Sequence, residues 1–208
     1  MRGLFITFEG IEHSGKTTQS RLIADRLRNT RRSVVLTREP GGTPLGTAIR
    51  ELVLQPSTDP IDTTAELLLF AADRAQHVRT LIQPALANGK VVISDRFHDS
   101  TRAYQGYGRG IDMDTIDRAI SLATGGLEPD LTILMDVDVE TSRARAEAND
   151  DRIEQDSNAF FDRVRHGFLE IARNSASRII VVNGTEPTQD VTARVADEVD
   201  RRLASLAD

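Results

Sequence analysis

Residues 10–17, Gly-Ile-Glu-His-Ser-Gly-Lys-Thr, combine two glycines, an ammonium group and a hydroxyl group in a spacing that suits phosphate binding. They fit the pattern G-x-x-x-x-G-K-[ST]. In such a turn, backbone N–H groups converge on phosphate oxygens, and the following helix adds the positive end of its dipole. Lys16 would reach the β- and γ-phosphates of a nucleotide, and the Thr17 hydroxyl would bind Mg²⁺.

The residues on either side of this turn agree with that interpretation. An apolar, β-prone run at 4–8 leads into the turn, and 17–28 has the character of a helix. A phosphate loop requires this order of strand, turn and helix. The alternative, a chance glycine turn before a surface helix, does not explain why all three parts agree.

Strand-like and helix-like segments alternate along the rest of the 208 residues. This alternation predicts an α/β fold, in which helices flank both faces of a five-stranded parallel sheet. The further strands are expected at 33–37, 91–94, 131–135 and 179–182. A long helix is expected at about 64–88, with a kink or restart at Pro84. No linker or repeat divides the chain, so we expect one domain, 1–208.

Charged residues follow two of the expected strands. Arg38 and Glu39 come after 33–37, and Asp95 and Arg96 come after 91–94. Ligands of open α/β sheets bind at the carboxyl ends of the strands, so Arg38 and Arg96 can converge on one phosphate. Asp95 there can hold Mg²⁺ through water or position the acceptor. The alternatives are surface ion pairs for the arginines and a helix N-cap for Asp95.

Composition excludes several other classes of protein. A net charge of −6 argues against a broad nucleic-acid-binding surface. The absence of cysteine excludes disulfides, zinc–thiolate sites and thiol catalysis. No apolar run approaches the roughly 20 residues of a membrane span, and the first apolar run is too short for a signal peptide. We therefore expect a cytoplasmic enzyme with neither a membrane nor a nucleic acid as partner.

Taken together, the loops at 9–19, 37–43, 95–96, 100–110 and 151–154 resemble those of bacterial thymidylate kinases, in the expected order over nearly the whole chain. The most specific stretches are Arg-Glu-Pro-Gly-Gly-Thr at 38–43 and Ala-Tyr-Gln-Gly at 103–106. The resemblance implies a P-loop nucleoside monophosphate kinase that phosphorylates dTMP to dTDP with ATP and Mg²⁺, in dTTP synthesis for DNA replication. It also implies a short mobile lid at about 142–157 and a homodimer, which we expect to form through the helix around 64–88.

The same resemblance assigns roles to individual residues. The expected catalytic residues are Lys16, Asp95, Arg96, Arg145 and Arg152. Those expected to bind ATP are Gly10, Ile11, Glu12, His13, Ser14, Gly15, Lys16, Thr17, Thr18 and Arg143. Those expected to bind dTMP are Glu12, Arg38, Glu39, Arg50, Phe70, Arg74, Arg96, Thr101 and Gln105. Thr17 and Asp95 are the expected metal ligands.

Several of these roles have structural alternatives. By resemblance Phe70 stacks on thymine and Arg74, one turn later, reads its O4, but Phe70 also belongs to a leucine run and suits a core. Glu39 is either a support for the arginines or a surface acid. The charged residues around Arg143 and Arg152 are either the lid or a solvated loop.

His13 departs from the bacterial family, which carries glycine at this place. Histidine adopts unusual loop backbone angles more readily than most residues, so the side chain can simply point to solvent. The alternative is that His13 reaches the triphosphate and becomes cationic when ATP binds, because charge pairing favours the protonated form.

Two other functions compete with the dTMP kinase. One is a kinase for another nucleoside monophosphate or for a deoxynucleoside; Arg38 and Arg96 favour a substrate that already carries a phosphate. The other is a nucleotide-dependent regulator, which would lack the lid arginines. ATP consumption coupled to added dTMP separates all three.

Overall fold

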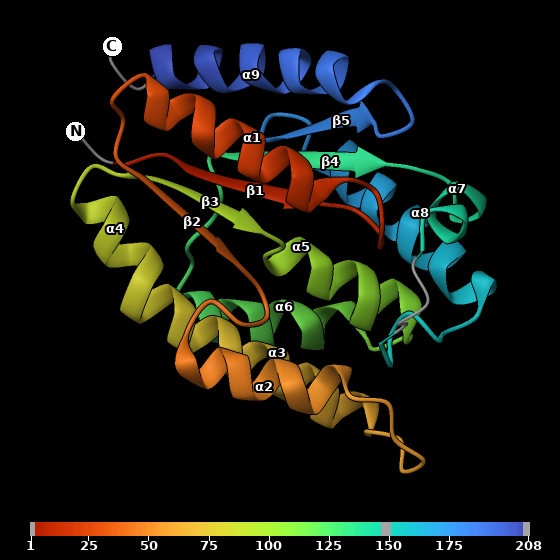
Figure 1. Ribbon diagram of the computed structural model, residues 1–208. Coiled ribbons are helices and arrows are strands. Elements are labelled where there is room, and N and C mark those ends of the chain that lie inside the picture. The colour runs from red at the N-terminus through yellow and green to blue at the C-terminus, as the bar shows by residue number, and fades with distance from the viewer. Residues whose placement is uncertain (1–2, 147–150, 206–208) are drawn as a thin grey trace.

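Five parallel strands form the centre of the computed structural model, which describes residues 3–146 and 151–205 (Figure 1). They are β1 (Phe5–Glu9), β2 (Val34–Arg38), β3 (Val91–Asp95), β4 (Leu131–Asp136) and β5 (Ile179–Asn183). Their order in the sheet is β2-β3-β1-β4-β5, and all four pairings are parallel. The predicted fold class is confirmed.

The helices cover both faces of this sheet (Figure 1). They are α1 (Lys16–Asn29), α2 (Pro44–Leu54), α3 (Thr63–His77), α4 (Gln83–Ala87), α5 (His98–Thr101), α6 (Met113–Thr124), α7 (Val139–Ala144), α8 (Asn158–Asn174) and α9 (Thr188–Ala204), with π-helical segments η1 (Val78–Ile82) and η2 (Arg102–Gly108). No helix in the described part of the chain is both long and apolar enough to cross a membrane.

Alternating side chains of the strands build two apolar layers, as the pleat requires. Ile6 and Phe8 of β1 pack with α1 and α9 on one face. Phe5, the residue just before Ile6, packs with Phe97 and the η1–α4 segment on the other face. Because β1 is buried on both faces, its position is fixed, and so is the position of the loop that follows it.

The expected long helix is present as three continuous segments. It begins at α3, whose N-cap Asp62 accepts a 2.8 Å bond from the Thr64 N–H. The π-helical η1 precedes α4, where Pro84 occupies one of the first two positions. A π turn just ahead of a proline absorbs the backbone bond that the proline cannot make. Pro84 therefore marks a restart rather than a break.

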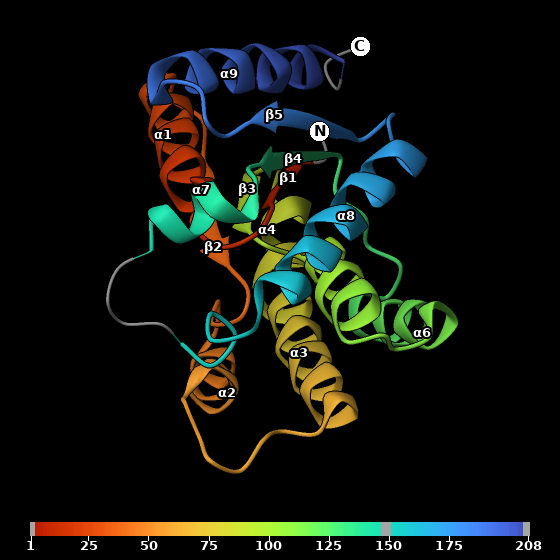
Figure 2. The same cartoon turned by 90° about the vertical axis from the view of Figure 1, so that its right-hand side faces the viewer.

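Residues 97–110 are mostly helical and lie against α8 (Figure 2). Two glycines permit this contact. A Cβ at Gly108 would lie 2.6 Å from Phe160 Cε2, and one at Gly167 would lie 2.6 Å from Tyr107 Cγ. The contact matters for function because η2 carries Tyr104 and Gln105 towards the site. Within the expected lid at 142–157, residues 147–150 lie outside the described part.

We predict that Gly167→Ala destabilises the fold by about 1–3 kcal/mol, because the new methyl overpacks against the Tyr107 ring. Alanine is otherwise the better helix former by about 1 kcal/mol. In a Tyr107→Ala background, where the ring is absent, the same substitution should therefore be neutral or stabilising. Urea denaturation of the four proteins measures both effects; destabilisation of equal size in both backgrounds would contradict the packing argument.

Candidate active site

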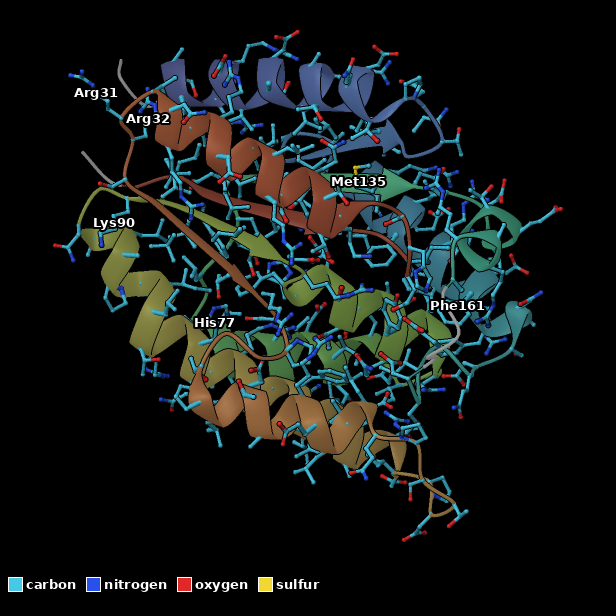
Figure 3. The ribbon with its side chains drawn as sticks, viewed as in Figure 1. Arg31, Arg32, His77, Lys90, Met135 and Phe161 are labelled. Atoms are coloured by element: carbon cyan, nitrogen blue, oxygen red, sulfur yellow. The ribbon has the colours of Figure 1, made fainter. Side chains whose placement is uncertain are left out.

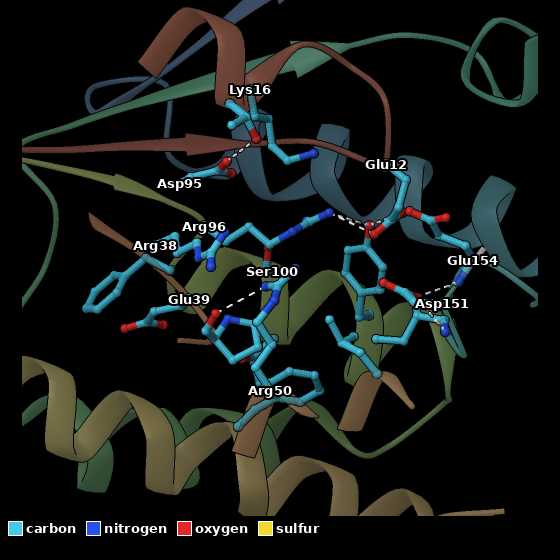
Figure 4. Close-up of a pocket in the computed structure, with 18 of the residues that line it drawn as sticks. Glu12, Lys16, Arg38, Glu39, Arg50, Asp95, Arg96, Ser100, Asp151 and Glu154 are labelled. Atoms are coloured by element: carbon cyan, nitrogen blue, oxygen red, sulfur yellow. Dashed lines mark hydrogen bonds and ion pairs between the residues drawn. The ribbon is translucent and has the colours of Figure 1, made fainter. Parts of the chain in front are cut away.

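A cavity of about 470 Å³ opens at the carboxyl edge of the sheet, where β1, β2 and β3 end (Figure 4). Its walls come from the loop after β1, the loop after β2, helices α2 and α3, the segment after β3, and the segments on both sides of the undescribed residues 147–150. The cavity therefore lies at the place that the sequence predicts for a ligand.

The loop after β1 has the backbone of a phosphate loop. Gly10 and Gly15 have φ of 136° and 96°, in the region that favours glycine. A Cβ at Gly10 would lie 2.4 Å from the Met135 carbonyl oxygen, so no side chain fits there. Helix α1 begins at Lys16, immediately after Gly15, and its N-terminus points its N–H groups at the loop. The Lys16 ammonium donates to the Ile11 carbonyl at 2.6 Å.

Thr17 and Asp95 come together across the cavity floor, where the Thr17 hydroxyl donates to Asp95 Oδ2. Both offer hard oxygen atoms, which Mg²⁺ prefers. Across residues 3–146 and 151–205, no group of three or more His, Cys, Asp or Glu side chains is placed to hold a metal. The donor set thus fits a Mg²⁺ ion that takes its remaining ligands from phosphate oxygens and water, as nucleotide-bound Mg²⁺ does.

Three arginines face one region of the cavity. Arg38 is the last residue of β2, Arg50 belongs to α2 and Arg96 follows β3 (Figure 4). Burial, and then the charges of Arg38 and Arg96, lower the pKa of Arg50, in keeping with the placement of all three arginines in one cavity. Such a cluster gains stability when an anion binds, and guanidinium groups match the geometry of a phosphate.

Arg96 is held in place by its neighbours. Its guanidinium donates to the Gly10 carbonyl at 2.9 Å and to Glu12 Oε1 at 2.8 Å, and it stacks over the Tyr104 ring at 5.0 Å. The Tyr104 hydroxyl donates to the other Glu12 oxygen at 2.6 Å. Arg96 is thus oriented before any ligand binds.

Glu9, at the end of β1, fixes the segment that carries Arg96. It accepts a 2.8 Å bond from the Phe97 N–H and a 2.6 Å bond from the Ser100 hydroxyl. Burial, with Asp99 adding to it, raises the pKa of Glu9 to about 7. Glu9 was not assigned a role from the sequence, and its position before the loop is the only signal that could have suggested one.

Arg74 occupies the inner wall and is almost fully buried. It donates to Glu39 Oε2 and to the Thr101 hydroxyl, both at 2.7 Å, and Glu39 also contacts His77 at 2.9 Å. Burial alone would raise the pKa of Glu39, but Arg74 and His77 lower it, so the carboxylate stays charged. Glu39 is therefore a buried support for Arg74, not a surface acid; Figure 3 shows His77 between α3 and the loop after β2.

The structure brings most of the predicted site residues to this cavity. Those that line it are Glu12, His13, Gly15, Lys16, Thr17, Thr18, Arg38, Glu39, Arg50, Phe70, Arg74, Asp95, Arg96, Thr101, Gln105 and Arg145. Gly10, Ile11 and Ser14 lie in the phosphate loop itself and are buried behind its surface. Phe70 is half-buried, so part of its ring is left for the cavity.

The three predicted lid arginines separate into two groups. Arg145 lines the cavity and donates to the Gly184 carbonyl at 3.0 Å. Arg143 does not line it; its guanidinium lies 4.8 Å from the centre of the Phe161 ring and donates to the carbonyls of Glu154 and Asp156. Arg152 does not line it either, because it donates to Glu66 and, at 2.7 Å, to the Val53 carbonyl.

His13 adopts a left-handed φ of 54°, as its residue type allows. Its side chain is 25% exposed at the cavity wall, and Nε2 lies 3.4 Å from Glu154 Oε1. The His13 side chain therefore does not simply point to solvent. Residues without an assigned role from the sequence also line the cavity: Pro40, Leu54, Phe97, Ser100, Tyr104, Asp151, Ile153 and Glu154.

We predict that ATP affinity falls as the pH rises through about 8. Burial, and next the charge of Arg96, lower the pKa of Lys16 to about 8. Above that pH the free protein carries a neutral Lys16, which cannot pair with phosphate, so affinity should drop by up to about tenfold per pH unit. Calorimetric titration with an ATP analogue between pH 7 and 9.5 measures the decline. Lys16→Arg, which does not titrate in this range, should bind without it; the same decline in both proteins would contradict the assignment.

Comparison with known proteins agrees with this geometry. The family model described as Thymidylate kinase matches residues 8–195. A thymidylate kinase of Trichormus variabilis is 53% identical, over 88% of this chain and 89% of that protein. A thymidylate kinase of Desulfosudis oleivorans is 45% identical, over 95% of this chain and 97% of that protein. The crystal structure of the thymidylate kinase from Ehrlichia chaffeensis is 40% identical, with a TM-score of 0.79 over 96% of this chain and 99% of that one. This chain belongs to the thymidylate kinase family.

Proposed function

We propose that this protein transfers the γ-phosphoryl group of ATP to the phosphate of dTMP, which gives dTDP and ADP. The observation that carries the proposal is the single cavity in which Lys16 of the phosphate loop faces the arginines Arg38, Arg50 and Arg96. The loop suits the phosphates of the donor, and the arginines suit the phosphate of an acceptor. A nucleoside without a phosphate would leave these guanidinium groups unmatched.

The reaction joins two anions, so its barrier is largely electrostatic. An oxygen of the dTMP phosphate attacks the γ-phosphorus of ATP, and the bond from that phosphorus to the β–γ bridging oxygen breaks as ADP leaves. Lys16 and the N-terminus of α1 offset the charge on the donor, and Arg96 offsets the charge on the acceptor. Thr17 and Asp95 would hold a Mg²⁺ ion, which supplies further charge neutralisation at the transferring phosphate when it is bound.

The inner wall of the cavity suits the thymine base. Phe70 offers a ring face, and Arg74 offers donors that match a carbonyl oxygen such as O4. Arg74 and Phe70 lie one turn apart on α3, so they reach the same side of the pocket. Thr101, which accepts a 2.7 Å bond from Arg74, and Gln105 complete the polar edge.

For the lid we propose distinct roles for the arginines. Arg145 lines the cavity and is the arginine that we expect to face ATP. Arg143 and Arg152, predicted as ATP-binding and catalytic residues, are instead proposed to hold residues 151–156 in place, since both are bound within the protein. We further propose that 1–208 is one kinase domain, in the cytoplasm where it would supply DNA synthesis.

A homodimer through the helix around 64–88 also remains our proposal. Leu68 of α3 and Leu52 of α2 are each 60% exposed, although both helices contribute to the folded core. An apolar surface that joins two packed helices is the kind of surface that a second subunit covers, and we propose that these leucines belong to one.

The substrate assignment predicts a definite order of selectivity. The values of kcat/KM for dTMP and dUMP should lie within about 10–200-fold of each other, since one methyl group is worth only about 1–3 kcal/mol in an apolar pocket. dCMP should be far poorer, because its amino group and N3 leave the polar groups of the pocket mismatched. ADP production measured with each nucleotide tests this, and dCMP turnover that rivals dTMP turnover would refute the base pocket. ATP consumption unaffected by any monophosphate would refute the kinase itself.

Arg145 is expected to act on the reacting complex more than on binding of the acceptor. Arg145→Ala should lower kcat by about 10²-fold or more, as removal of a charge-stabilising donor does, while the dTMP dissociation constant stays within about twofold. Arg173→Ala, an exposed change on α8, serves as control. A loss confined to dTMP affinity would show that Arg145 binds the acceptor instead.

A further inference from the structure

Glu66 is a buried carboxylate between the base pocket and residues 151–156, which are called the lid segment below. Its residue exposure is 1%. It lies on α3 one turn before Phe70 and two turns before Arg74, so one face of this helix carries all three. The phosphoryl transfer described above gives Glu66 no role, and a buried carboxylate is costly unless it is fully paired.

Three side chains from different parts of the chain pair with Glu66. Gln105 of η2 donates through Nε2 at 2.9 Å, and Arg109 donates through Nε at 3.3 Å. Arg152, from the lid segment, donates to the other carboxylate oxygen. Burial alone would raise the pKa of Glu66, but Gln105, Arg109 and Arg152 lower it, so the group is an anion at neutral pH.

The pairing with Gln105 has a consequence for base recognition. An ionised carboxylate only accepts hydrogen bonds, so the amide of Gln105 must turn its nitrogen towards Glu66. The amide oxygen is then left to accept a bond from elsewhere, and Gln105 lines the cavity. An acceptor matches the N3–H of thymine or uracil but not N3 of cytosine, which is itself an acceptor.

The pairing with Arg152 has a consequence for the position of residues 151–156. Besides Glu66, Arg152 donates its Nε to the Val53 carbonyl at 2.7 Å and its backbone N–H to the Leu54 carbonyl at 2.9 Å. Arg109, also on Glu66, makes two 2.8 Å bonds to Asp156. These contacts attach residues 151–156 to α2 and α3, and the three segments lie near one another in Figure 2. The same segment places Asp151 and Glu154 at the cavity wall.

We propose that Glu66 is a positioning residue that couples recognition of the base to the placement of residues 151–156 at the cavity wall. There Glu154 Oε1 lies 3.4 Å from His13 Nε2 of the phosphate loop, so the placement of this segment bears on the ATP side of the cavity. A base that binds the Gln105 oxygen favours the amide orientation that Glu66 requires, and the same carboxylate holds Arg152. Filling the base pocket therefore stabilises the attachment of residues 151–156, and this attachment favours binding of the base by the same factor. This inference rests on the proposed function.

The test is the effect of dTMP on binding of a non-hydrolysable ATP analogue, measured by calorimetry. In the wild-type protein, saturating dTMP should tighten the analogue by about fivefold or more. Glu66→Gln keeps the shape of the side chain but removes its charge, and its amide can donate as well as accept hydrogen bonds. The ratio of the analogue's dissociation constants without and with dTMP should therefore fall close to one. The same variant should also discriminate less between dTMP and dCMP. Glu51→Gln, an exposed change on α2, should match wild type.

A second variant separates coupling from stability. Arg152→Gln should also bring the ratio close to one, and it leaves the side chains that line the base pocket unchanged. If both residues act through one contact, the double variant should show no further loss. Should Glu66→Gln fail to fold, Arg152→Gln decides the question alone.

Three results would overturn the inference. The first is a ratio of one in wild-type protein that phosphorylates dTMP. The second is a ratio in the variants as large as that of wild type. The third is a Glu66→Gln protein that loses only thermal stability. A wild-type protein that neither binds nor phosphorylates dTMP would instead refute the proposed function.

Discussion

The guanidinium of Arg96 joins the phosphate loop to the end of β3, and the rest of the site depends on this contact. Arg96 has a left-handed φ of 71°, a conformation that a non-glycine residue keeps only where its surroundings impose it. Those surroundings are the Gly10 carbonyl, Glu12 and Tyr104 around the side chain, and Glu9 on the following backbone. Because β1 and β3 are neighbours in the sheet, one residue can touch both the donor loop and the acceptor region.

Charge pairing divides the arginines of the site by task. Arg74 and Arg152 are each neutralised by a buried carboxylate, Glu39 and Glu66, and such fully paired groups fix the shape of the walls. Arg38, Arg50 and Arg96 face the cavity together, and among them Arg96 has Glu12 as its ion-pair partner. This part of the cavity therefore retains the positive charge that an entering phosphate needs.

Local sequence patterns predicted the features that local chemistry determines. The phosphate loop, the five strands and the restart at Pro84 all follow from short-range patterns of glycine, β-branched residues and proline. The partner of each arginine could not be predicted in this way, because it depends on which segments the fold brings together. The same charged stretch of the sequence contains Arg143, Arg145 and Arg152. Of these three arginines, the structure places only Arg145 at the cavity. Glu66, inside a helix whose neighbours are mostly apolar, gave no signal until Gln105 and Arg152 were seen beside it.

We propose that Arg96 and its neighbouring arginines bind the phosphate of the acceptor nucleotide. It is tested most directly by the dissociation constants of dTMP and of thymidine, measured on wild type and on Arg96→Met. We expect the variant to bind dTMP at least about tenfold more weakly, because a hydrogen bond to a charged group is worth about 1.5–3 kcal/mol. Its affinity for thymidine, which carries no phosphate, should stay the same. Equal losses for both ligands, or an unchanged affinity for dTMP, would contradict it.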